Sequence, residues 1–150
     1  MIARRTWLRR SSKPVSRSAP PKRAKANKGK RTPARRKERI GLSKQADALW
    51  SRLVKLPGRC VACGSTERLQ AAHGFSRRYR GTRWLPINGF CLCARHHMFW
   101  THRPLEWGEY LLQAWGAPAH EELLRLALRP AKPDFPAIIA ALTVEIEARS

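Results

Sequence analysis

The side chains best suited to metal binding or catalysis in this 150-residue chain lie between positions 60 and 97. Two cysteines with a two-residue spacing are followed, about thirty residues later, by a Cys-x-x-His pair. This is the spacing of a four-ligand site for a structural zinc ion. The predicted zinc ligands are Cys60, Cys63, Cys93 and His96.

Three further polar residues in the same stretch are candidates for catalysis. His73 is a candidate general base, because neutral imidazole is the base available near pH 7. Asn88 is a candidate orienting amide, and His97 is a candidate ligand for a divalent ion that neutralises charge on a phosphate. A base, an amide and a metal ligand in this order suggest metal-assisted hydrolysis of a phosphodiester bond.

These assignments leave alternatives open. His97 is an alternative zinc ligand to His96, and Cys91 is an alternative to Cys93, although the Cys-Leu-Cys alternation favours a core position for Cys91. His73, taken alone, would be a satisfied core histidine. Two disulfides are another use for four cysteines, but the Cys-x-x-Cys spacing beside histidines favours metal binding and a reducing compartment, the cytoplasm.

Hydrophobic periodicity and turn residues predict the elements that position these side chains. The first is a helix over 42–56 with Ser43 as its N-cap, ended by Pro57-Gly58. Two strands, at 69–73 and 84–90, flank a polar loop, and a helix begins near Cys93 or Ala94. Three more helices are predicted to cover the motif region, a dimer interface being the alternative; they span 104–115, 119–128 and 135–148.

Positive charge is distributed unevenly along the chain. The net charge is +15 over residues 1–40, +9 over 41–103 and −3 over 104–150. This asymmetry favours a polyanionic partner, above all DNA. Residues 1–40 are poor in apolar side chains, so they are predicted to form a disordered basic arm that contacts phosphates. No apolar run is long enough for a membrane span, and no secretory signal is recognisable.

The loop between the two predicted strands is rich in arginine and free of acids. Guanidinium groups there would contact phosphates on both sides of a cut and provide affinity with little sequence readout. The predicted DNA-binding residues are Arg77, Arg78, Arg80 and Arg83.

This order of elements and polar residues resembles the HNH, or His-Me finger, nucleases. His73 ends the first strand, Asn88 follows fifteen positions later, and His97 lies nine positions further, on the helix. The flanking Cys-x-x-Cys and Cys-x-x-His-His segments are similar to those of zinc-bearing members, and the match covers residues 60–102. Together with the basic N-terminus, the combination also resembles the phage recombination nucleases of the NinG and Ref groups.

The resemblance implies an α+β fold. A small zinc-stabilised ββα-metal core would lie at 41–103 with its leading helix, followed by a helical extension at 104–150. It also implies an endonuclease of low sequence specificity that uses Mg²⁺ or Mn²⁺ bound by His97 and His102. The biological setting would be bacteriophage recombination or DNA processing in the host cytoplasm, with a recombinase as a candidate partner.

Two positions depart from the family pattern. Ala72 stands where the family often has Asp or His, and Thr101 stands where its helix commonly has another His. Both substitutions predict a weakened or inactive site for the catalytic ion. A non-catalytic, zinc-stabilised nucleic-acid-binding protein is therefore the alternative function. A basic ribosome-associated protein would explain the N-terminus but not the three polar residues together.

Overall fold

The computed structural model describes residues 32–150, so most of the predicted basic arm lies outside the described residues. The described part combines five helices with a two-stranded antiparallel sheet, which confirms the α+β class. None of these helices is both long and apolar enough to cross a membrane.

Helix α1 (Pro33–Lys55) begins well before the predicted start at residue 42. Thr32 is its N-cap and accepts a hydrogen bond from the Arg35 N–H at 3.5 Å, so Ser43 is an internal helical residue. The predicted disorder of residues 33–40 is therefore wrong. Ala, Arg, Lys and Glu in this segment have high helix propensity, and they extend a helix that is already anchored by its apolar stripe.

The sheet pairs β1 (Leu69–His73) with β2 (Gly89–Cys93), so that Leu69 lies opposite Cys93 and His73 opposite Gly89. The first strand is as predicted, but the second begins five residues later than the predicted 84–90. Residues Pro86–Asn88 form a 3₁₀ turn, η1, in its place. Pro86 explains the difference, because it has no N–H to donate to a strand partner and its fixed φ suits the first position of such a turn.

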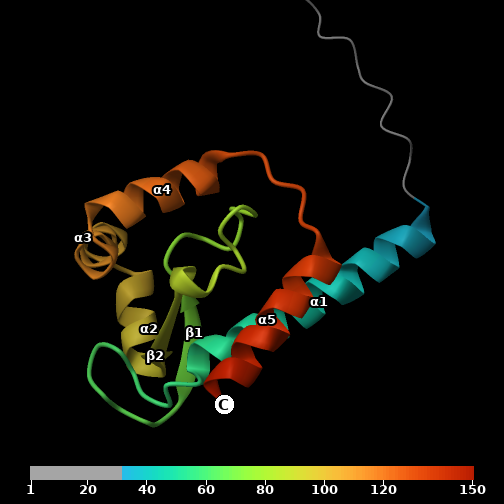
Figure 1. The fold of residues 1–150 in the computed structure, drawn as a ribbon. Helices are drawn as coiled ribbons and strands as arrows, with labels where there is room; N and C mark the ends of the chain where they lie inside the picture. Colours follow the sequence, from blue (N-terminus) through green and yellow to red (C-terminus); the bar gives the residue numbers. More distant parts are fainter. Residues whose placement is uncertain (1–31) are drawn as a thin grey trace, which may run out of the picture. The chain divides into compact units, whose positions relative to one another are not determined.

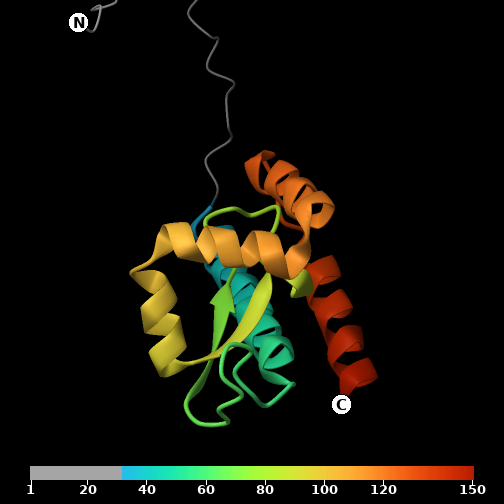
Figure 2. The same ribbon diagram turned by 90° about the vertical axis from the view of Figure 1, so that its left-hand side faces the viewer.

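The two faces of the sheet are covered by different helices (Figures 1 and 2). Ala71 lies in a core shared with α1, whereas its neighbour Ala72 lies in a core shared with α3 (Pro104–Trp115). His73 is on the α1 face, since successive side chains of a strand alternate. Helix α2 (Ala94–Thr101) follows β2 directly and contacts the other face through Gln70.

The C-terminal helices cover the motif region, as predicted. Helix α5 (Phe135–Arg149) lies alongside α1 (Figure 1), and α3 packs on the opposite face of the sheet. Helix α4 (Ala117–Leu128) follows α3 after Gly116, which has a φ of +73°. Two indole N–H groups of α3 tie it to the ends of the 74–88 segment: Trp107 donates to the Gly74 carbonyl and Trp115 to that of Ile87.

Candidate metal centre and histidine site

The four predicted zinc ligands converge at one end of the sheet. Their ligand atoms, the Sγ atoms of Cys60, Cys63 and Cys93 and a ring nitrogen of His96, all lie within 4.8 Å of one another. Among residues 32–150 this is the only such group of His, Cys, Asp or Glu. The Cys3His donor set was therefore predicted correctly, and Cys91 and His97 are not part of it.

The distances between the ligand atoms of this cluster suit a metal ion with tetrahedral coordination. A zinc–sulfur bond of about 2.3 Å implies a ligand-to-ligand separation of about 3.8 Å at the tetrahedral angle. The observed separations are 3.7 Å from Cys60 Sγ to His96 Nδ1, 3.9 Å from Cys63 Sγ to Cys93 Sγ, and 3.3 Å from Cys93 Sγ to His96 Nδ1. The residues present thus fit a zinc ion, which would link the segment before β1 to the start of α2.

Local backbone geometry prepares the first cysteine pair for a metal. Gly64, with a φ of +73°, donates its N–H to the Cys60 carbonyl at 2.8 Å and closes a tight turn around the thiols. Burial raises the pKa of Cys60, but hydrogen bonds from the backbone N–H groups of Cys93, Ala62 and Cys63 outweigh burial and lower it to about 6. A thiol with this pKa is largely thiolate at neutral pH, which is the form that binds zinc.

All four cysteines are free thiols, so the disulfide alternative is wrong for this structure. Cys91 is buried on the α1 face, where it packs with apolar residues. Its pKa is raised by burial, which keeps the thiol protonated and unreactive.

His73 lies at the end of β1 and is held by two contacts. Its ring stacks on the indole of Trp50 in α1, with centroids 3.9 Å apart and an interplanar angle of 14°. Its Nε2 lies 3.1 Å from the Arg83 carbonyl oxygen. Because a carbonyl oxygen only accepts hydrogen bonds, Nε2 carries the proton, and in the neutral ring Nδ1 has the free lone pair.

The Nδ1 atom of His73 makes no hydrogen bond within residues 32–150 and is not fully buried. Among those residues, a fully buried side-chain nitrogen or oxygen without a partner occurs only at Nε1 of Trp100. The ring is half-buried, and burial lowers the pKa of His73, an effect to which the charges of Arg83 and Arg77 add. The Arg83 carbonyl and Asp47 act in the opposite direction but do not cancel it. His73 is therefore neutral at pH 7.

An acidic residue of α1 fixes the peptide that holds His73. Asp47 accepts two hydrogen bonds from the Arg83 guanidinium, at 3.0 and 2.6 Å, and a third from Nε1 of Trp84 at 2.8 Å. Arg83 was predicted to bind phosphate, but its guanidinium instead forms an ion pair with Asp47. Neither the contact of Trp50 with His73 nor that of Asp47 with Arg83 was predicted from the sequence. The one available signal was that Asp47 is an isolated acid in a basic region.

Asn88 is fully buried and fixes the loop between the strands. Its Oδ1 accepts from the Phe75 N–H at 2.7 Å, and its Nδ2 donates to the carbonyls of Phe75 and Thr82. The predicted role in holding the loop agrees with these bonds. The expected orientation of the His73 ring by an Asn88 side-chain bond is absent; Asn88 instead bonds the carbonyl of Thr82, next to Arg83, and its own carbonyl accepts from the N–H of Gly74, next to His73.

The structure does not bring His97 next to His73. His97 is bonded through Nδ1 to Oε1 of Gln70, three residues before His73 and therefore on the other face of β1. His102 is exposed at the C-cap of α2. Within residues 32–150 these two histidines form no group of three ligands, so a preassembled site for a second ion is lacking there.

The other three loop arginines are exposed. Arg77 and Arg80 make no ion pair in the described part of the chain, and Arg78 donates to the Tyr79 hydroxyl at 2.8 Å. Of the three, Arg77 is near enough to His73 for its charge to help lower the pKa of that ring.

Comparison with known protein families, curated proteins and solved structures found no match to this chain. The function is therefore inferred from the residues of the site itself.

Proposed function

We propose that the protein is a metal-dependent DNA endonuclease whose general base is His73. The observation that carries this proposal is the state of the His73 ring. Its proton is directed at the Arg83 carbonyl, its lowered pKa favours the neutral form, and its Nδ1 makes no hydrogen bond within residues 32–150.

The mechanism follows from the residues around this ring. A water molecule beside Nδ1 would lose a proton to His73 as its oxygen bonds to the phosphorus and the bond from phosphorus to the 3′ oxygen breaks. The products would be a 5′-phosphate and, once the 3′ oxygen takes a proton from solvent, a 3′-hydroxyl. The ring can then become a cation, because Asp47 and the Arg83 carbonyl both favour the protonated form. The exposed guanidinium groups of Arg77, Arg78 and Arg80 would hold the flanking phosphates.

A Mg²⁺ or Mn²⁺ ion would supply charge neutralisation on the phosphate and the departing oxygen. Of the two predicted ligands, His97 lies on the opposite face of β1 from His73, and His102 is exposed at the end of α2, so neither is placed beside Nδ1 of His73. Because the described residues offer no group of three ligands there, water and the substrate phosphate would have to complete the coordination. The zinc cluster is a structural element in this proposal.

The test is cleavage of supercoiled plasmid by zinc-loaded protein with added Mg²⁺ or Mn²⁺. We expect His73→Ala to abolish nicking while its thermal unfolding and zinc content match the wild type. His120→Ala is the matched control and should cut normally, since His120 lies outside the cluster and the His73 contacts. Nicking that persists in His73→Ala would disprove the assigned base.

A second candidate function is nucleic-acid binding without cleavage. Ala72 faces the α3 core where the family pattern often has a metal ligand, and Thr101 bonds to the His97 carbonyl. Both observations favour a site without a catalytic ion. Tight DNA binding combined with no cleavage in any divalent metal would support this alternative.

A further inference from the structure

The arginine-rich loop between the two strands, residues 74–85, is in close backbone contact with α4 at Gly81 (Figure 1). A side-chain carbon added to Gly81 would lie 2.1 Å from the carbonyl oxygen of Leu126 and 3.0 Å from its carbonyl carbon. Both are backbone atoms of a helix, so they cannot rotate away as the end of a side chain would. The φ of Gly81 is not positive, so glycine is needed here for space.

The part of α4 that meets Gly81 is firmly packed. Leu123 and Ala127, which lie on either side of Leu126 in the sequence, have only 4% and 6% of their surfaces exposed. The last turns of α4 therefore form a fixed surface, and the loop has to fit against it.

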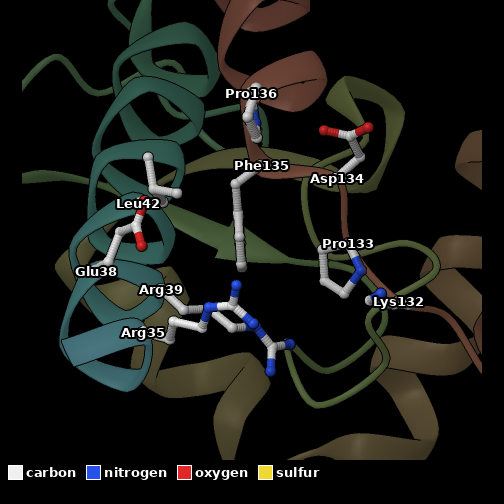
Figure 3. A pocket seen from close by; sticks show the side chains of 9 residues that line it. All are labelled: Arg35, Glu38, Arg39, Leu42, Lys132, Pro133, Asp134, Phe135 and Pro136. Atoms are coloured by element: carbon white, nitrogen blue, oxygen red, sulfur yellow. The ribbon is translucent and has the colours of Figure 1, made fainter. Parts of the chain in front are cut away.

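Helix α4 nevertheless lies outside the two main cores. None of its residues belongs to either apolar core beside the sheet. The segment after it is also loosely packed, since Lys132 and Pro133 border a hollow of about 590 Å³ that Arg39 of α1 lines as well (Figure 3). The helix can thus be altered without removing a side chain from either core.

Thr82 connects Gly81 to Arg83 with little freedom to adjust. It is fully buried, and its polar groups are all bonded. Its N–H and its hydroxyl both donate to the Tyr79 carbonyl, at 3.2 and 3.3 Å, and its own carbonyl accepts from Nδ2 of Asn88 at 3.0 Å. A displacement at Gly81 therefore reaches the next residue along the chain.

That next residue, Arg83, holds the His73 ring. Its carbonyl accepts from Nε2 of His73 at 3.1 Å and so determines which ring nitrogen keeps its lone pair. The charges of Arg83 and Arg77, both on this loop, also act on the pKa of His73. The position of the loop against α4 is therefore linked to the state of the ring.

We propose that Gly81 is a positioning residue for His73 and that α4 is the support against which it acts. The contact with Leu126 fixes the loop, the loop fixes the Arg83 carbonyl, and this carbonyl orients the ring. The inference rests on the proposed function for the catalytic role of His73, but the positioning itself can be measured without cleavage.

The experiment compares zinc-loaded Gly81→Ala with the wild type by NMR titration of the His73 ring protons. We expect the pKa of His73 to rise toward its usual 6.5, because a displaced loop covers the ring less and burial is the main cause of the lowered pKa. Single-turnover cleavage at saturating protein should slow by about tenfold or more, since a misplacement of about 1 Å can cost about a hundredfold in rate.

A second variant tests the same contact from α4 and serves also if Gly81→Ala does not fold. Leu124→Pro interrupts the helix two residues before Leu126, at an exposed position, and leaves the loop sequence intact. It should raise the pKa of His73 as well, whereas Leu124→Ala, which keeps the helix, should not.

The matched control for the added methyl group is Gly108→Ala in α3, where the new carbon would meet no other part of the protein within 4 Å. Ile146→Val is the control for lost stability, because it removes a methyl group from the core between α1 and α5. Both should keep the wild-type pKa of His73 and the wild-type cleavage rate.

An unchanged pKa of His73 in either folded variant, Gly81→Ala or Leu124→Pro, would overturn the inference. An equal rise in Ile146→Val would overturn it too, because general loosening of the fold would then explain the effect. Absence of cleavage by the wild type would overturn the proposed function alone, since the NMR comparison does not depend on it.

Discussion

At the scale of single residues, the proposed chemistry depends on which His73 nitrogen carries the proton. Burial lowers the pKa of His73 below its usual value of 6.5, so the neutral form persists as the pH falls through that value. On acidification, cleavage should therefore decline only at a lower pH than it would with an unperturbed histidine as the base, as the ring becomes protonated. The measurement is the pH dependence of single-turnover cleavage. A rate that already declines above pH 7 on acidification would contradict the lowered pKa.

Asp47 should act on His73 at a distance through Arg83. In Asp47→Asn the carboxylate charge that raises the pKa of His73 is lost, and the Arg83 charge that lowers it is no longer paired. The pKa of His73 should fall further, and cleavage should slow by about tenfold because the Arg83 carbonyl is less firmly placed.

The pKa of His73 can be followed by NMR titration of its ring protons, which requires no activity. Glu67→Gln is the control, since it removes the other acid of residues 41–103 at an exposed position. A higher pKa in Asp47→Asn, or the same fall in the Glu67 variant, would exclude this role for Asp47.

The zinc ligands could be predicted at residue level because thiol and imidazole spacing reports directly on a tetrahedral site. Contacts between distant side chains could not. Arg83 looks like its arginine neighbours in the sequence, yet Asp47, 36 residues earlier, neutralises it. The stacking of Trp50 on His73 likewise depends on how α1 crosses the sheet, which residue spacing does not encode.

At the scale of elements, the zinc cluster should hold the hairpin to the helix that follows it. A two-stranded sheet is marginal by itself, and Cys60 joins it through the metal to Cys93 and His96. Cys60→Ser should lower the Tm by more than about 10 °C. A loss of about 1 kcal/mol in the free energy of unfolding shifts the Tm of a domain this size by roughly 4 °C.

The measurement is thermal unfolding by circular dichroism, with zinc content determined in parallel. Chelation of the metal from wild-type protein should reproduce the effect. His73→Ala serves as the control that should keep both the metal and the Tm. A Cys60→Ser protein as stable as the wild type would mean that the cluster does not support the fold.

Element boundaries were predicted well where apolar periodicity and proline coincide, as at Pro104 and Phe135. The predicted boundaries were wrong where they depended on charge or on turn residues. Residues 33–40 look disordered by composition, but they continue a helix whose next turns are buried at Ala46 and Trp50. Leu85 looks like part of a strand, but Pro86 directs the chain into a turn before pairing begins at Gly89.

At the scale of the whole molecule, the basic charge of residues 1–31 should add affinity without adding selectivity. This segment carries twelve Lys and Arg and no acid. Its removal, with α1 kept intact from Thr32, should weaken DNA binding and flatten the dependence of log Kd on log salt, since fewer counterions are released. Anisotropy titrations over a range of salt concentrations measure this. An unchanged salt slope in the truncated protein would argue against phosphate contacts in this segment.

The cysteine arrangement has a consequence for how the protein withstands oxidation. Three thiols converge on one metal position, and the fourth, Cys91, is almost completely enclosed. In a molecule with a metal bound at this position, three of the four thiols would serve as ligands and the fourth is buried. Loss of the ion would uncover Cys63, which is the exposed member of the set, and cross-linking between chains would begin there. An ion at this position would thus both link the hairpin to the helix and limit oxidation of the thiols that bind it.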